Sequence, residues 1–294
     1  MKQIGFDNDK YLSMQSAHIR ERISQFGDKL YLEFGGKLFD DYHASRVLPG
    51  FAPDSKLQML LQLADQAEMI ISINASDIER NKIRHDLGIT YDQDVLRLID
   101  VYQKKGLYVS SVVITRYAGQ PSANLFQKKL ESIGIQVYHH YTIDGYPNNI
   151  DKIVSDDGYG KNDYIKTTRP LVIVTAPGPG SGKMATCLSQ LYHDGYLDEA
   201  RAVEQTSVFE AAETFAKVEG ILPAPESSHA IRVAIDEALK CKETGEEKNI
   251  VFGLTGTGYF DMFAYQRYND HEMSDYIPTD EELQKSLSTL PVVE

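Results

Sequence analysis

The sequence contains no tryptophan, and only two of its 294 residues are cysteines, Cys187 and Cys241. Two cysteines exclude a disulfide framework, and their wide separation is unlike the close spacing of zinc ligands. We therefore assign no metal and expect a reducing compartment, the cytoplasm. Long hydrophobic runs are missing as well: none approaches the ~20 apolar residues that cross a bilayer, and the first ten residues are too polar for a signal peptide. We expect a cytoplasmic protein with no membrane partner.

Positive charge is scarce. Lysine and arginine number 30 against 43 aspartates and glutamates, which gives a formal net charge of −13. Because a nucleic-acid-binding protein needs clustered cations, we expect no nucleic-acid partner. The imbalance is confined to one part of the chain: residues 1–190 hold 22 basic and 22 acidic residues, whereas residues 191–294 hold 8 and 21. A shift of this kind is typical of a domain boundary.

Short apolar strands alternate with amphipathic helices along residues 1–190. We predict strands at residues 29–34, 69–74, 108–115, 135–138 and 170–175. Helices are predicted at 55–66, 94–105, 123–132 and 184–191, after a first helix that Asp7 or Asn8 caps. Strands that alternate with helices are typical of βαβ units, so we predict an α/β fold with a mainly parallel, Rossmann-like sheet and flanking helices. In such sheets the ligand site lies beyond the carboxyl ends of the strands.

A glycine-rich turn, APGPGSGK at residues 176–183, follows the last predicted strand. Small residues let backbone N–H groups approach a phosphate, and a lysine adds a full positive charge. The turn departs from the P-loop pattern, because Pro177 replaces its first glycine and Met184 its magnesium-binding hydroxyl, unless Thr186 supplies that hydroxyl one turn later. We expect a phosphorylated small molecule or nucleotide here, the alternative being a purely structural turn. The predicted binding residues are Gly178, Gly180, Ser181, Gly182, Lys183 and Thr186.

Polar side chains also follow several predicted strands. Carboxylates and amides in strand-end loops are suited to acid–base work or cation binding. The alternative is that each cluster is a solvated loop. Of the paired His139 and His140, strand alternation turns only one inward. The candidate polar residues are Glu33, Asp40, Asp41, His43, Asn74, Asp77, Asp156 and Asp157.

Four segments carry a resemblance to a bacterial family, domain of unknown function 1846, also called UPF0371. They are GFDNDKYL at 5–12, LYLEFGGKLFDDYHASRVLPGF at 30–51, INASDIERNKIRHDLGITYD at 73–92 and VSDDGYGKNDYIKTTRPLVIVTAPGPGSGKMATCLSQLYH at 154–193. The resemblance runs from residue 1 to about residue 193 and implies an α/β fold without implying an activity. Members of the family are much longer, so the chain is similar to their N-terminal portion only.

Residues beyond 194 follow a different pattern, with helices predicted at 204–217 and 228–242 and a strand at 249–254. The segments EARAVEQTSVFEAAETFAKVEGILPAPESSHAIRVAIDEAL at 199–239 and IVFGLTGTGYFD at 250–261 resemble the C-terminal end of tryptophan synthase β-chains and related pyridoxal phosphate (PLP) enzymes. This resemblance implies that Glu226 faces the cofactor and that the Thr255 hydroxyl hydrogen-bonds the PLP pyridine nitrogen. It also implies that Gly256 keeps the loop close to the ring.

The Schiff-base lysine and the phosphate loop of that family precede this segment, and neither has a match here. The alternative function is therefore a PLP-dependent lyase or an inactive remnant of one. We predict two domains, residues 1–193 and a smaller helix-rich α/β segment at 194–294 with an acidic tail, in which 281–287 forms a short helix. The two resemblances lead to the hypothesis that the chain is a hybrid of two truncated proteins. Apolar faces left exposed in the second part predict association into a homo-oligomer.

Overall fold

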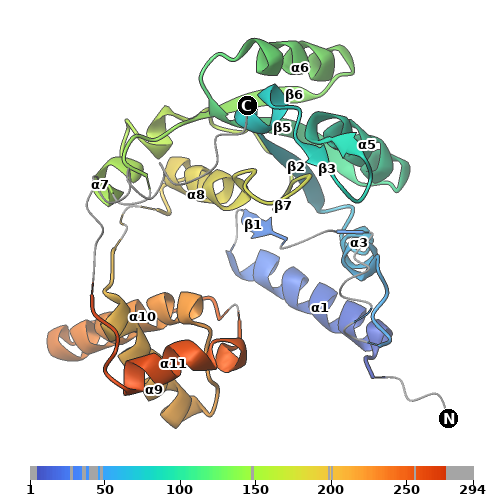
Figure 1. Ribbon diagram of the computed structural model, residues 1–294. Coiled ribbons are helices and arrows are strands. Elements are labelled where there is room, and N and C mark those ends of the chain that lie inside the picture. The colour runs from blue at the N-terminus through green and yellow to red at the C-terminus, as the bar shows by residue number, and fades with distance from the viewer. Residues whose placement is uncertain are drawn as a thin grey trace. The chain divides into compact units, whose positions relative to one another are not determined.

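A computed structural model of the chain describes residues 5–26, 29–34, 38–39, 46, 49–146, 149–197, 199, 201–254 and 256–275. The chain folds as two compact units, Met1–Ala200 and Arg201–Glu294, which are described separately below (Figure 1). The short helix predicted at 281–287 lies outside the described residues. None of the helices in the described ranges combines the length and the apolarity that crossing a bilayer requires.

The first unit is built on a five-stranded sheet in which every neighbouring pair of strands is parallel. All residues of the second and third strands across the sheet are buried, as expected where helices cover both faces. The predicted Rossmann-like α/β fold is confirmed. The order across the sheet is β1 (Leu30–Glu33), β7 (Leu171–Thr175), β2 (Ala67–Asn74), β5 (Tyr108–Tyr117) and β6 (Gln136–Tyr141).

Eight helices and a small antiparallel hairpin in the described ranges surround this sheet (Figure 1). The hairpin consists of β3 (Ile83–Arg84) and β4 (Ile89–Thr90) and lies between the second strand and the helix that follows it. The helices are α1 (Asn8–Phe26), α3 (Ser55–Leu61), α4 (Ala75–Glu79), α5 (Tyr91–Lys104), α6 (Pro121–Ser132), α7 (Ile150–Ile153), the 3-10 helix η1 (Tyr159–Lys161) and α8 (Lys183–His193).

Alternate residues of the central strands pack into two separate hydrophobic cores. Met69, Ile71 and Ile73 of β2 pack in a large core with α1, α3, α5 and α6. Ile70 of β2 points to the opposite face, where Cys187 of α8 contributes to a smaller core. Because side chains alternate across a strand, one continuous apolar run supplies both faces, and the unit has three layers.

The strand order creates a switch point between β2 and β7. After β2 the chain proceeds outward through β5 to β6, and it then returns to place β7 on the other side of β2. The helix after β7, α8, packs towards β1, whereas the helices after β2 pack towards β5. The loops that follow β2 and β7 therefore leave in opposite directions, which is the arrangement that opens a ligand crevice at the carboxyl edge of such a sheet.

The second unit is helical over its described residues, with α9 (Gln205–Glu219), α10 (Pro225–Thr244), η2 (Gly258–Phe260) and α11 (Met262–Asn269). Phe209, Ala212 and Tyr265 form its core. The strand predicted at 249–254 is wrong: these residues form neither strand nor helix, and the Val251 side chain is 86% exposed. A strand needs a neighbour to accept its hydrogen bonds, and the described part of this unit offers only a single bridge between Pro223 and Thr257.

Gln190 of α8 fastens the segment before β7 to this helix. Its side chain is fully buried; the amide nitrogen donates to the Ile165 carbonyl at 2.9 Å and the amide oxygen accepts from the Ile165 N–H at 2.9 Å. Replacing Gln190 by leucine keeps the volume but leaves both backbone groups of Ile165 without partners. We expect Gln190→Leu to lower the free energy of unfolding by about 2–4 kcal/mol in urea titrations.

The matched control is Gln103→Leu, the same change at an exposed position of α5. Surface changes of this kind usually stay within about 0.5 kcal/mol. Equal unfolding midpoints for the two variants would contradict the buried amide pairing.

Candidate functional site

The glycine-rich turn connects Thr175, the last residue of β7, to Lys183, the first residue of α8. Gly180 and Gly182 have φ angles of +77° and +85°, in the left-handed region that favours glycine. A Cβ atom at Gly178 would overlap the hydroxyl group of Tyr91. Backbone conformation or close packing therefore requires glycine at all three positions. A turn with a purely structural role would require the same glycines.

Two neighbouring strands hold the turn in place. Asn74, at the end of β2, donates from its amide nitrogen to the Gly180 carbonyl at 3.4 Å and accepts from the Ser76 N–H at 2.9 Å. The hydroxyl group of Thr115, near the end of β5, donates to the Ser181 carbonyl at 3.0 Å. The turn therefore lies at the carboxyl edge of the sheet, at the switch point between β2 and β7.

Lys183 and Glu33 meet across the ends of α8 and β1. The Lys183 Nζ atom is 3.5 Å from Glu33 Oε1, and the two side chains are 16% and 23% exposed. The second carboxylate oxygen, Oε2, is buried and has no hydrogen-bond partner in the described part of the chain. Two residues that were predicted for separate clusters thus form one ion pair.

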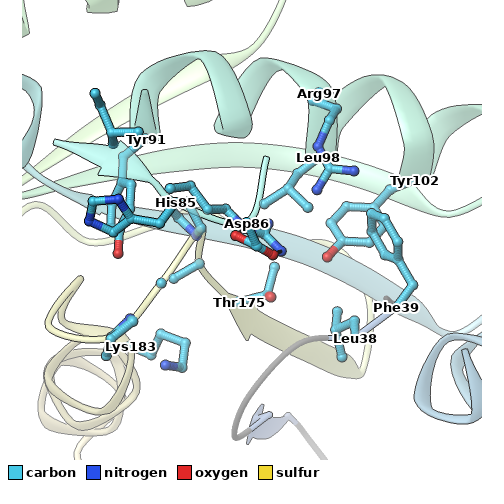
Figure 2. Close-up of a pocket in the computed structure, with 16 residues that line it drawn as sticks. Leu38, Phe39, His85, Asp86, Tyr91, Arg97, Leu98, Tyr102, Thr175 and Lys183 are labelled. Carbon is cyan, nitrogen blue, oxygen red and sulfur yellow. Dashed lines mark hydrogen bonds and ion pairs between the residues drawn. The ribbon is translucent and has the colours of Figure 1, made fainter. Parts of the chain in front are cut away.

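A cavity of about 590 Å³ opens on one side of the turn; we call it the first cavity. Lys183 lies on one side of it, and His85 and Tyr91 lie on the opposite side (Figure 2). One end is apolar, with Leu98 and Tyr102 of α5 in the wall. The described residues that line the first cavity are Leu38, Phe39, Ile83, Arg84, His85, Asp86, Tyr91, Arg97, Leu98, Tyr102, Thr175, Ala176, Pro177, Gly178, Pro179 and Lys183.

Two arginines in the wall of the first cavity are fixed by one buried carboxylate. Asp94 is fully buried; its Oδ2 accepts from Arg84 Nη1 at 2.6 Å and its Oδ1 accepts from Arg97 Nε at 2.8 Å. Asp86 accepts from Arg84 Nε at 3.0 Å. Charge-assisted bonds of this length hold guanidinium groups in one orientation. Each of the three cations among the described lining residues therefore has a carboxylate partner: Asp86 and Asp94 for Arg84, Asp94 for Arg97, and Glu33 for Lys183.

The two predicted hydroxyl groups of the turn are used internally. Thr186 is fully buried, and its hydroxyl donates to the Gly182 carbonyl at 3.0 Å, one turn back in α8. The Ser181 hydroxyl donates to the Gly178 carbonyl at 2.9 Å. Neither contact brings a hydroxyl group to the magnesium position of a P-loop.

The remaining polar candidates are dispersed. Asp77 forms an ion pair with Lys82 at 3.2 Å, and Asp156 accepts from the Tyr192 hydroxyl at 3.0 Å. Asp157 is exposed. Asp77, Asp156 and Asp157 are not among the described residues that line the first cavity. Of the predicted polar residues, Glu33 and Asn74 therefore contact the turn or the helix that follows it, whereas the three aspartates do not line the first cavity. Asp40, Asp41 and His43 lie outside the described residues.

In the second unit, the segments 199–239 and 250–261 contact each other. The Ala224 N–H donates to the Gly256 carbonyl at 3.1 Å. Glu226, in the first turn of α10, and Gly256 are both exposed. Thr255 lies outside the described residues.

Sequence reasoning missed Tyr91 and Arg97, which line the first cavity, and Asp94, which binds the two arginines of its wall. A signal for Asp94 was available, because it stands on the apolar face of α5 beside Val95 and Leu98. A charged residue among core positions needs a partner of opposite charge, which points to Arg84 and Arg97.

The fold and the site define a class: a parallel α/β domain with a glycine-rich turn and a lysine at its switch point. The family described as "Domain of unknown function DUF1846, N-terminal" matches residues 4–216, and the chain belongs to this family. The match extends beyond residue 193, where the first resemblance was expected to end.

Curated relatives support the same assignment. A UPF0371 protein of Streptococcus sanguinis (strain SK36) is 61% identical over 194 residues, which are 66% of this chain and 39% of the relative. UPF0371 proteins of Streptococcus pyogenes serotype M5 (strain Manfredo) and Streptococcus pneumoniae (strain Hungary19A-6) are 60% and 59% identical over the same length and with the same coverage. The chain thus spans 39% of the length of these relatives in the matched region.

Cys187, one helical turn after Lys183, offers a test of the packing at this site. Its side chain is 6% exposed, and burial together with the Glu33 carboxylate raises the pKa of the thiol to about 12. Because the thiolate is the reactive form, a raised pKa leaves almost none of it at about pH 8. We expect the native protein to titrate with a single thiol towards Ellman's reagent, and the unfolded protein with two.

The single reactive thiol is Cys241, which is only half-buried. Cys241→Ser should therefore be unreactive when folded, whereas Cys187→Ser should titrate like the parent protein. Fast labelling of folded Cys241→Ser would show that α8 does not bury Cys187 against the sheet.

Proposed function

We propose that the first cavity binds a phosphate-bearing small molecule, with its phosphate beside Lys183. The observation that carries this proposal is the position of Lys183, at the first residue of α8, directly after a glycine-rich turn and at the switch point of a parallel sheet. The N-terminus of a helix offers backbone N–H groups and a favourable dipole to an anion, and the lysine adds a full charge. Ligands of such sheets bind at this edge.

The rest of the first cavity supports a ligand with a second, less polar part. Phe39, Leu98 and Tyr102 line the end away from the turn, and burial raises the pKa of Tyr102 so that its hydroxyl stays protonated and hydrogen-bonded to Thr175. Arg84 and Arg97 flank this end with fixed guanidinium groups. A nucleotide or an aryl phosphate has this combination of a charged group and a planar apolar one.

Binding, rather than hydrolysis, is the activity that these residues favour. The hydroxyl that holds magnesium in a P-loop is replaced by Met184, and the Thr186 hydroxyl is already bonded to the Gly182 carbonyl. The proposal therefore rests on Lys183, the turn and the two arginines.

The first test compares Lys183→Met with the parent protein in a thermal-shift screen of nucleotides and sugar phosphates. We expect at least one ligand to raise the melting temperature of the parent protein, and its affinity to fall about tenfold or more in Lys183→Met, which corresponds to about 1.4 kcal/mol or more. Lys183→Arg, which keeps the charge, should retain part of the affinity.

Lys128→Met, at an exposed position of α6, is the matched control and should bind as the parent protein does. The melting temperature of each variant without ligand shows whether loss of the Glu33 ion pair has changed the fold. A ligand-induced shift that persists undiminished in Lys183→Met would remove the proposal.

For the second unit we propose an inactive remnant of a PLP enzyme in a hybrid chain. The adjacency of Ala224 and Gly256 supports the resemblance, because it places the two similar segments side by side. The acidic charge confined to residues 191–294 supports a separate origin for the residues beyond 216, where the family match ends. The cofactor itself does not fit the described residues, since Glu226 and Gly256 are exposed and enclose no ring.

Addition of PLP tests this second proposal. A cavity of about 610 Å³ in this unit is lined by one lysine, Lys248, whose ammonium lies 3.1 Å from a Glu246 carboxylate oxygen. We expect equal absorbance spectra for the parent protein and Lys248→Met after PLP is added and the excess removed, because surface lysines react alike in both. An imine band that Lys248→Met abolishes would reveal a working Schiff-base lysine.

A further inference from the structure

A second cavity, of about 530 Å³, lies against the opposite side of the glycine-rich turn. Gly180 and Gly182 line it, whereas Gly178 and Lys183 line the first cavity. The other walls come from the ends of β5 and β6, from η1 and from Ala185 of α8. The described residues that line the second cavity and are used below are Arg116, Gln120, His140, Tyr141, Tyr146 and Tyr159.

Arg116 reaches this cavity from a strained backbone. Its φ angle is +51°, in the left-handed region, and it lies where the register between β5 and β6 shifts, between Ile114 and Tyr117. Gln120 stabilises this conformation by donating from its amide nitrogen to the Arg116 carbonyl at 3.2 Å. Long side chains rarely adopt left-handed conformations, and such strain is concentrated at functional sites.

The guanidinium group of Arg116 is available for a ligand. The residue is exposed, and no carboxylate of the described ranges forms an ion pair with it. This distinguishes Arg116 from Arg84 and Arg97 of the first cavity, which are bound by Asp94. An unpaired arginine at the rim of a cavity suits a phosphate or a carboxylate, because its planar fork forms two parallel hydrogen bonds.

His140 contributes a buried, neutral ring to the wall of the same cavity. It is 3% exposed, and its Nε2 lies 3.3 Å from the Asp163 carbonyl oxygen, so Nε2 carries the proton. Burial lowers the pKa of His140 to about 4, which keeps the ring neutral at pH 7. The lone pair on Nδ1 is therefore unprotonated, and this buried atom has no hydrogen-bond partner among the described residues.

Three tyrosines complete the lining. Tyr159 of η1 is 2% exposed, Tyr141 at the end of β6 is half-buried, and Tyr146 is exposed. Aromatic side chains provide flat apolar surface on which planar rings stack. A cavity of 530 Å³ lies within the range that holds a cofactor-sized or nucleotide-sized molecule.

We propose that the second cavity binds a ligand of its own, a planar ring compound that carries an anionic group, the chemistry of a nucleoside monophosphate. Arg116 binds the anionic group, and the three tyrosines contact the ring. This site uses its own cation and does not depend on Lys183. The two faces of one turn therefore serve two ligands.

The test is isothermal titration of the full chain with adenosine monophosphate, adenosine and inorganic phosphate. It uses the Lys183→Met background, so that binding in the first cavity does not contribute. We expect adenosine monophosphate to bind at one site, Arg116→Gln to weaken this binding about tenfold or more, and Arg22→Gln on exposed α1 to leave it unchanged. Adenosine should bind equally with and without Arg116→Gln.

Arg116→Gly separates function from folding. Glycine adopts the left-handed conformation without strain, so this variant should melt about 2 °C higher than the parent protein while losing the same affinity as Arg116→Gln. A lower melting temperature would mean that Arg116 is needed for the fold, and would overturn the interpretation of its strain.

The outcomes separate the two sites. Complete loss of adenosine monophosphate binding in Lys183→Met, or binding that Arg116→Gln leaves unchanged, would overturn the second site. Loss of adenosine monophosphate binding in Arg116→Gln but not in Lys183→Met would support the second site, even where no binding is found in the first cavity. Absence of any binding in the Lys183→Met background at millimolar concentration would also overturn it.

Discussion

The hydrogen bonds from Asn74 and Thr115 to the carbonyls of the glycine-rich turn are the contacts on which the functional edge of the protein depends. They tie the loop after β7 to the ends of β2 and β5, so the start of α8 has a fixed position relative to three strands. Lys183 then meets Glu33 at the end of β1, and the cavities form on either side of the turn. A parallel sheet gathers these groups because all of its strands end at the same edge.

Charge is arranged differently on the two sides of the turn. In the first cavity, Asp94 lies fully buried and accepts hydrogen bonds from two arginines, and its removal would take one carboxylate partner from each of them. In the second cavity the arginine is exposed and unpaired within the described ranges, and strain is stored in its backbone. The first cavity therefore has an internally balanced wall, whereas the second has an arginine that forms no ion pair with the described residues.

The fold of the first unit could be predicted from local pattern, because each strand is a short apolar run between glycine-terminated helices. The order of the strands could not, since it depends on the return of β7 to the side of β2, far from β6. For that reason Lys183 and Glu33 were predicted separately, and their contact emerged only from the pairing of β1 with β7. The apolar residues 249–254 do not form the predicted strand, because a local preference for extended backbone does not supply a neighbouring strand for hydrogen bonding. The conformation of Arg116 follows from the register of β5 and β6, which composition does not encode.

The glycine-rich turn is a wall common to both cavities, and this has a thermodynamic consequence. Gly182 already packs against the Thr115 side chain, where an added Cβ would lie 2.9 Å from Cγ2, so the turn has little room to move without changing both cavities. If both cavities bind ligands as proposed, the two ligands contact opposite sides of this one element. Whatever one ligand then does to the affinity of the other, the second does to the first by the same factor, since the coupling free energy is a property of the pair. A titration of either cavity would therefore report the same coupling.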